Sequence, residues 1–221
     1  MEEHRWTLGR MQNPVRGILH GSAAVAAIAG TALLVVQAPN WGIRVGVIVF
    51  GLALVALYTT SSLYHSIPWR EVWKRRMQRM DHTMIIVLIA GTYTPVILAT
   101  LDGPWRWTVL SVVWGTVLIG ALQHIFFPRE SQAFSMALGA GMGWLGLTIA
   151  WKFVSELGWT ASGLAVLGGA IYTIGIVLLV TNRPRLWPKV FSYHELFHVM
   201  VVTASVVHFV MVWRYVLPAA A

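Results

Sequence analysis

Two histidines four residues apart, His194 and His198, open an apolar run near the end of the chain, in the sequence FSYHELFHVM (191–200). Helical residues at this spacing lie about 40° apart around the axis and about 6 Å apart along it, so both imidazoles face one point. Such a pair can bind a divalent metal, and His-Glu-x-x-His, with Glu195 as general base, is typical of zinc metalloproteases. Another kind of metal site and two ordinary buried histidines are the alternatives.

The composition indicates the environment in which these histidines lie. The chain has 221 residues, of which 57% are hydrophobic and 11% charged, and its mean hydropathy is +0.67. Soluble domains carry about 25% charged residues, so an integral membrane protein is expected and nucleic acid is not an expected partner despite the net positive charge. The first residues hold no immediate apolar core, so no cleaved signal peptide is expected. Cysteine is absent, so a metal would depend on His, Asp or Glu.

Several segments are long and apolar enough to cross a bilayer, for which a helix needs roughly 20 residues. The predicted spans are 17–38, 44–66, 82–101, 107–127, 133–153, 162–181 and 194–216. The connections between them are short. The sequence therefore predicts an all-α membrane protein, a seven-transmembrane helix bundle that forms a single domain over residues 1–221.

The basic residues predict the orientation of this bundle. Of the 16 Lys and Arg residues, all but Arg44, Arg106, Lys152 and Arg214 fall on one side of the predicted membrane. Because cytoplasmic loops are rich in Lys and Arg, the N-terminus is expected in the cytoplasm and the C-terminus outside. The residues assigned to the cytoplasmic side are Arg5, Arg10, Arg16, Arg70, Lys74, Arg75, Arg76, Arg79, Arg129, Arg183, Arg185 and Lys189.

This orientation brings chemically active residues of three spans to the cytoplasmic edge. His65 ends the second span with Ser61 one turn deeper, Asp81 precedes the third, and His194 and His198 begin the seventh. Unrelated polar groups have no reason to share a depth, and ionisable groups inside the membrane tend to mark function. The shared depth favours a metal site over chance burial.

The same topology counts against a protease. An intramembrane metalloprotease needs a third ligand, and Asp102 in Leu101-Asp102-Gly103 is the candidate. However, Asp102 falls in an outer connection, roughly 30 Å across the bilayer from His194. Glu195 points about 100° away from His194 around the helix. It is expected to be a helix-start carboxylate favoured by the helix dipole.

Several motifs together resemble the hemolysin III branch of the progestin and adipoQ receptor family, which includes the adiponectin receptors. They are Ser61-x-x-x-His65, Asp81, GTYTPV at 91–96, His194-x-x-x-His198 and the pair His20-Gly21. The resemblance implies seven spans, an N-terminus inside, and a zinc ion (Zn²⁺) held by His65, His194 and His198 near the cytoplasmic face. It also implies that Asp81 holds the metal through water and that Ser61 lies near it. The family is related to alkaline ceramidases.

The function predicted from these residues is zinc-dependent hydrolysis of a lipid amide or ester at the cytoplasmic side of the inner membrane. A three-histidine site leaves one position for water, which Asp81 could orient or deprotonate. Ser61 could bind a ligand or only its own helix backbone. Lipids are the expected partners and could enter laterally between helices. The alternatives are a receptor or regulator of membrane lipid state with structural zinc, and a haemolytic pore.

The remaining histidines are weaker candidates. His20 and His124 lie near the same edge and could support the ligands from a second layer, or simply be buried. His82 could only reach toward the headgroups. His208 is about 15 Å deeper than His198 and is expected to be a buried packing or hydrogen-bonding group.

Overall fold

The computed structural model of the protein describes residues 11–126, 132–187 and 190–221, and within these ranges its regular elements are helices joined by short connections, with an isolated bridge between Trp187 and Phe191. The first four helices are α1 (Pro14–Gln37), α2 (Trp41–Ser66), α3 (Glu71–Thr100) and α4 (Gly103–Phe126). The rest are α5 (Gln132–Trp144), η1 (Leu145–Ile149), α6 (Ala150–Thr181), α7 (Tyr193–Met211), η2 (Val212–Val216) and α8 (Leu217–Ala219). The predicted all-α class is confirmed. Arg5, Arg10, residue 127, Arg129 and Lys189 lie outside the described residues.

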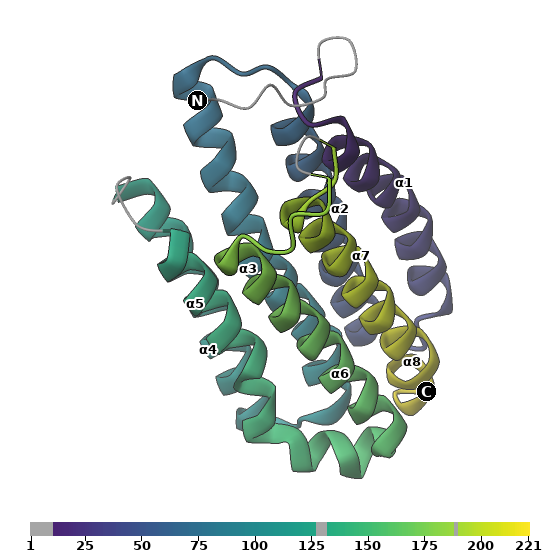
Figure 1. Ribbon diagram of the computed structural model, residues 1–221. Coiled ribbons are helices and arrows are strands. Elements are labelled where there is room, and N and C mark those ends of the chain that lie inside the picture. The colour runs from purple at the N-terminus through teal and green to yellow at the C-terminus, as the bar shows by residue number, and fades with distance from the viewer. Residues whose placement is uncertain (1–10, 127–131, 188–189) are drawn as a thin grey trace.

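The helices form a bundle in which neighbours along the chain contact each other (Figure 1). The core is formed mainly by aliphatic side chains with a few aromatic ones, and Phe50, Leu34, Ile86 and Ile97 are among the fully buried residues. Many other large apolar side chains face outward, as expected where lipid replaces water. The multi-pass membrane protein predicted from composition is therefore supported by the helices.

In the described part of the chain, six helical runs are long and apolar enough to cross a membrane, where the sequence predicts seven. The difference arises at Ala137–Thr181, a run of 45 residues that covers most of the fifth predicted span (133–153) and all of the sixth (162–181). A straight helix of that length would extend about 68 Å, twice the hydrocarbon thickness. The run is not straight, because Gly158 has φ 79° and ψ 172°, a conformation that other residues rarely adopt. Figure 1 shows the chain descending along α5 and returning along α6.

The third helix begins earlier than its apolar stretch. The predicted span starts at residue 82, whereas α3 starts at Glu71 and continues through the basic segment. No glycine or proline interrupts residues 71–80, and Glu71 pairs with Arg75 one turn later at 2.7 Å. The helix is therefore longer than the bilayer requires, and its first turns carry basic side chains beyond the apolar region.

Hydrogen bonds between distant segments define the two ends of the bundle. The backbone N–H of Asn13 donates to the carbonyl of His65 at 3.0 Å, so the start of α1 lies beside the end of α2. At the other end, the Asn40 side-chain amide donates to the carbonyl of Ala220 at 3.1 Å, so the C-terminus lies beside the connection between α1 and α2. The start of α1 and the C-terminus thus lie at opposite ends.

Candidate metal centre

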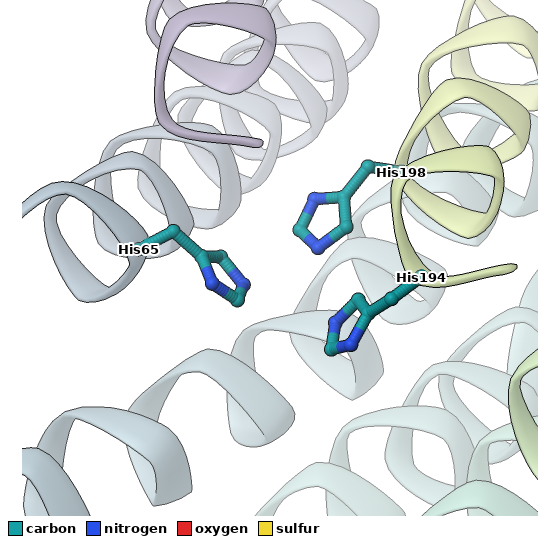
Figure 2. A group of neighbouring side chains, drawn as sticks. All are labelled: His65, His194 and His198. Carbon is teal, nitrogen blue, oxygen red and sulfur yellow. The ribbon is translucent and has the colours of Figure 1, made fainter. Parts of the chain in front are cut away.

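Three histidine side chains converge between the end of α2 and the start of α7 (Figure 2). His65 lies in the last turn of α2, and His194 and His198 lie in the first two turns of α7. Each offers a ring nitrogen, and these three nitrogens lie within 4.8 Å of one another. His65 and His198 are 3% and 2% exposed. The structure therefore brings together all three histidines that the sequence singled out.

The arrangement of the rings fits a metal ion of ordinary size. The ring centroid of His65 lies 5.5 Å from that of His194 and 4.7 Å from that of His198. A tetrahedral zinc with nitrogen ligands at about 2.1 Å requires nitrogen–nitrogen separations of about 3.4 Å. Small side-chain rotations would bring the three nitrogens from separations of up to 4.8 Å to this distance. Three imidazoles that converge in a low-dielectric site are a suitable donor set for a borderline metal, so the cluster could bind one.

Asp81 of α3 and Ser61 of α2 lie next to each other. The Asp81 carboxyl group and the Ser61 side chain are hydrogen-bonded, and both residues are buried. Ser61 was expected to bind either a ligand or its own helix backbone, and both alternatives stay predictions. Its hydroxyl pairs with a carboxyl group from α3, which packs against α2.

A cavity of about 500 Å³ lies beside the histidine cluster. It lies among α3, α5, α6 and α7, and its wall includes Asp81, His194 and His198. Its wall also includes His208 and Met211, the first of which is about 15 Å along α7 from His198. Most of the wall is aliphatic and aromatic. A single cavity therefore joins the polar cluster to a long apolar space.

Glu195 has a structural role that explains the protease-like spacing. Its carboxylate accepts a hydrogen bond from the backbone N–H of Ser192 at 2.9 Å, completing a capping box at the start of α7. The same carboxylate forms a buried ion pair with Arg16 of α1 at 2.7 Å. Glu195 does start the helix, as predicted, but its partner Arg16 was expected only in the basic cytoplasmic segment. The available signal in the sequence was the position of Arg16, a charged residue directly before the apolar span predicted at 17–38.

Three other residues considered in the sequence, Asp102, His124 and His208, have partners of their own outside the three-histidine cluster. Asp102 lies at the far end of α3, where its exposed carboxylate pairs with Arg106 at 2.8 Å, so it cannot join the histidines. His124 bonds to the Thr83 hydroxyl at 2.7 Å, between α3 and α4. His208 meets the carbonyl of Ala165 at 3.2 Å, which supports its predicted role as a buried hydrogen-bonding group.

His20 is the histidine that joins the cluster from a fourth position. It is 2% exposed, and its Nε2 atom lies 3.0 Å from Nδ1 of His198. Its ring also meets Tyr58 edge-on, with centroids 5.1 Å apart. The position of His20 therefore agrees with a supporting layer, whereas His124 lies away from the three histidines.

The buried ion pair generates a stability prediction. Replacing Glu195 with Ala removes a carboxylate from a buried guanidinium and from a helix cap, which should cost about 3–5 kcal/mol of unfolding free energy. Glu156→Ala is the matched control, because Glu156 pairs with Lys152 on an exposed helix face, where such pairs contribute about 0–1 kcal/mol. Thermal unfolding in detergent should show a clearly lower midpoint for Glu195→Ala only. Equal midpoints would contradict the structural role.

Comparison with known proteins places this chain among relatives of similar length. Residues 9–209 match the family described as Haemolysin-III related. Hemolysin-3 of Bacillus cereus is 34% identical over 206 residues, covering 92% of this chain and 91% of the relative. The Hemolysin-3 homolog of Bacillus subtilis (strain 168) is 31% identical over 201 residues, covering 90% and 91%. The monocyte to macrophage differentiation factor of Homo sapiens is 25% identical over 206 residues, covering 89% and 81%. The chain therefore belongs to the haemolysin-III-related family of membrane proteins.

Proposed function

We propose that this protein is a zinc-dependent hydrolase of a lipid amide or ester in the bacterial inner membrane, with its site at the cytoplasmic side. The observation that carries the proposal is that a mainly apolar cavity is lined by the buried carboxyl group of Asp81 and by two of the three clustered histidines, His194 and His198. A polar reacting end beside an apolar space is the shape that a lipid requires. Membrane lipids are therefore the proposed partners, and nucleic acid is not.

The proposal includes seven crossings in one domain, with the N-terminus in the cytoplasm. The start of α1 and the C-terminus lie at opposite ends of the bundle, which requires an odd number of crossings. Six apolar runs can satisfy this only if one of them crosses twice, and the run broken at Gly158 is long enough to do so. The basic residues at the end that holds the histidines favour the cytoplasm for that end.

Zinc is the proposed metal because the three candidate ligands are imidazoles and the chain has no cysteine. A zinc ion held by three histidines supplies Lewis acidity and lowers the pKa of a water molecule to about 7. His65, His194 and His198 would hold the ion. Asp81 would accept a proton from the attacking water, and Ser61 would hold the Asp81 carboxylate in place through their hydrogen bond.

The cavity would bind the apolar part of the substrate. Its volume of about 500 Å³ falls within the usual range for small-molecule sites. The amide or ester would lie beside Asp81 and His194, with the chain directed toward Met211. Burial of the chain would hold the scissile group in position and exclude other water from the site.

A second candidate is a receptor or regulator in which zinc has only a structural role. It is favoured by the placement of the histidines on α2 and α7, because a bound ion would join two helices that are far apart in sequence. Lysis is a third candidate, suggested by the name of the Bacillus cereus relative. Among the described residues the buried core is mainly apolar, which argues against a wide polar pore and favours the first two candidates.

The metal assignment predicts the composition of the purified protein. Wild type should contain about one zinc per chain, and His65→Ala and His194→Ala should each lose most of it, because two imidazoles bind zinc far more weakly than three. His124→Ala is the control. This variant should keep its zinc, because the His124 side chain bonds to Thr83 between α3 and α4. Elemental analysis measures all four proteins. Full zinc content in both ligand variants would exclude the site.

The hydrolase assignment predicts the behaviour of Asp81→Asn. With a mixed lipid extract, wild type should release fatty acid, and the variant should be slower by about 10²- to 10⁴-fold because it cannot accept a proton. Mass spectrometry of the released acids measures the rate, and zinc content shows whether the site stays loaded. Asp102→Asn is the control, because its carboxylate is exposed at the opposite end. Equal rates for Asp81→Asn and wild type would reject this mechanism.

The topology can be tested with reporter fusions. A reporter that is active only in the cytoplasm should be silent after Ala221 and active when inserted between α6 and α7, because these positions lie at opposite ends of the bundle. A reporter that is active only outside should show the reverse pattern. Cytoplasmic activity at the C-terminus would contradict seven crossings with the N-terminus inside.

A further inference from the structure

Helix α1 contributes none of the three candidate ligands, yet its first turns touch every element that carries one. Most of this helix faces outward, and Val25, Ile28 and Val36 are exposed. Its early residues differ, because Arg16 and His20 are buried polar side chains one turn apart on the same face. Buried polar groups on a peripheral apolar helix are costly, so their partners indicate what they do.

The first partner is His198. Its Nδ1 atom lies 3.0 Å from Nε2 of His20, and both rings are buried. With Nδ1 engaged by His20, the Nε2 atom of His198 is the one left for a metal. A neutral imidazole that binds through Nε2 carries its proton on Nδ1, so His198 would donate and His20 would accept. This hydrogen bond would select the tautomer and the ring orientation that a ligand needs.

The second partner is the first turn of α7. The Arg16 guanidinium donates through Nε to Oε1 of Glu195 at 2.7 Å. Its Nη2 atom also lies 2.7 Å from the same oxygen. Because Glu195 lies between His194 and His198 in sequence and also caps the helix with Ser192, this ion pair holds the ligand-bearing turn against α1.

The third partner is the last turn of α2. The backbone N–H groups of Gln12 and Asn13 donate to the carbonyls of Ser66 and His65 at 3.3 and 3.0 Å. The Ser62 hydroxyl donates to the carbonyl of Gly17 at 2.8 Å. The carbonyls of His65 and Ser66 are the last two in α2, where carbonyls have no partner within their own helix. The start of α1 therefore ties down the turn that carries His65.

From these contacts we infer that residues 12–20 form a positioning segment for the metal centre, in which His20 orients His198 while Arg16 and the backbone hold the two ligand-bearing helix ends. All three ligands lie at helix ends, where the backbone is least constrained, whereas a metal site needs its ligands held within about 0.5 Å. The inference rests on the zinc-binding part of the proposed function and not on the hydrolysis.

The test compares zinc affinity in His20→Ala, His20→Gln and His208→Ala with wild type, by competition with a chelator in detergent. Loss of a hydrogen-bond partner of a ligand typically weakens metal binding by about 10- to 100-fold, and this is expected for His20→Ala. His20→Gln should recover part of the loss, because its amide oxygen can accept from His198. His208→Ala is the control, since it removes a partly buried imidazole that lies against the carbonyl of Ala165 and about 15 Å along α7 from His198.

Two further measurements separate positioning from general stability. Thermal unfolding without metal should give similar midpoints for His20→Ala and His208→Ala, although only the first loses zinc affinity. The visible spectrum of bound Co²⁺ reports ligand geometry, and it should change in His20→Ala and remain close to wild type in His208→Ala.

Each outcome decides the inference. A zinc affinity within twofold of wild type for His20→Ala, or an equal loss for His208→Ala, would overturn it. A wild-type protein that binds no zinc would overturn both the metal site and its positioning segment. Zinc affinities as expected, without any lipid hydrolysis, would support the positioning segment while overturning the proposed hydrolase.

Discussion

Polar side chains among membrane-spanning helices are stable only where they find partners, and this constraint organises the whole bundle. The buried polar groups at one end satisfy each other across helices: Arg16 with Glu195, His20 with His198, and Ser61 with Asp81. Each pair joins two different helices. The packing of α1, α2, α3 and α7 at this end therefore depends on the same contacts that arrange the three histidines.

The cavity follows from the same separation of polar and apolar groups. Once the polar side chains are gathered at one end, the space among α3, α5, α6 and α7 is left mainly to aliphatic and aromatic residues. The result is a mainly apolar cavity whose wall includes the polar side chains of Asp81 and His194. A lipid matches this arrangement better than a soluble substrate does, because its polar and apolar parts are separated in the same way.

The His-Glu-x-x-His spacing shows how one pattern can serve different chemistry. In a zinc metalloprotease the glutamate of this motif acts as general base. Here Glu195 is engaged by a helix cap and by Arg16, so its carboxylate is directed to α1 and not to the histidines. The carboxyl group in the cavity wall is that of Asp81, which comes from another helix. Spacing on one helix singled out two of the three histidines that the structure brings together, whereas His65 and Asp81 come from other helices.

The sequence alone determined the membrane class, the approximate positions of the apolar helices and the depth shared by His65, Asp81, His194 and His198. These properties depend on composition, on helical periodicity and on the side to which basic residues are assigned, all of which are local or additive along the chain. Only the tertiary structure decided that the fifth and sixth predicted spans form one helical run broken at Gly158. It also decided that Arg16 and His20 reach α7 and that Ser61 pairs with Asp81. Those results depend on which helix faces pack together, and a single amphipathic pattern cannot specify a partner nearly 180 residues away.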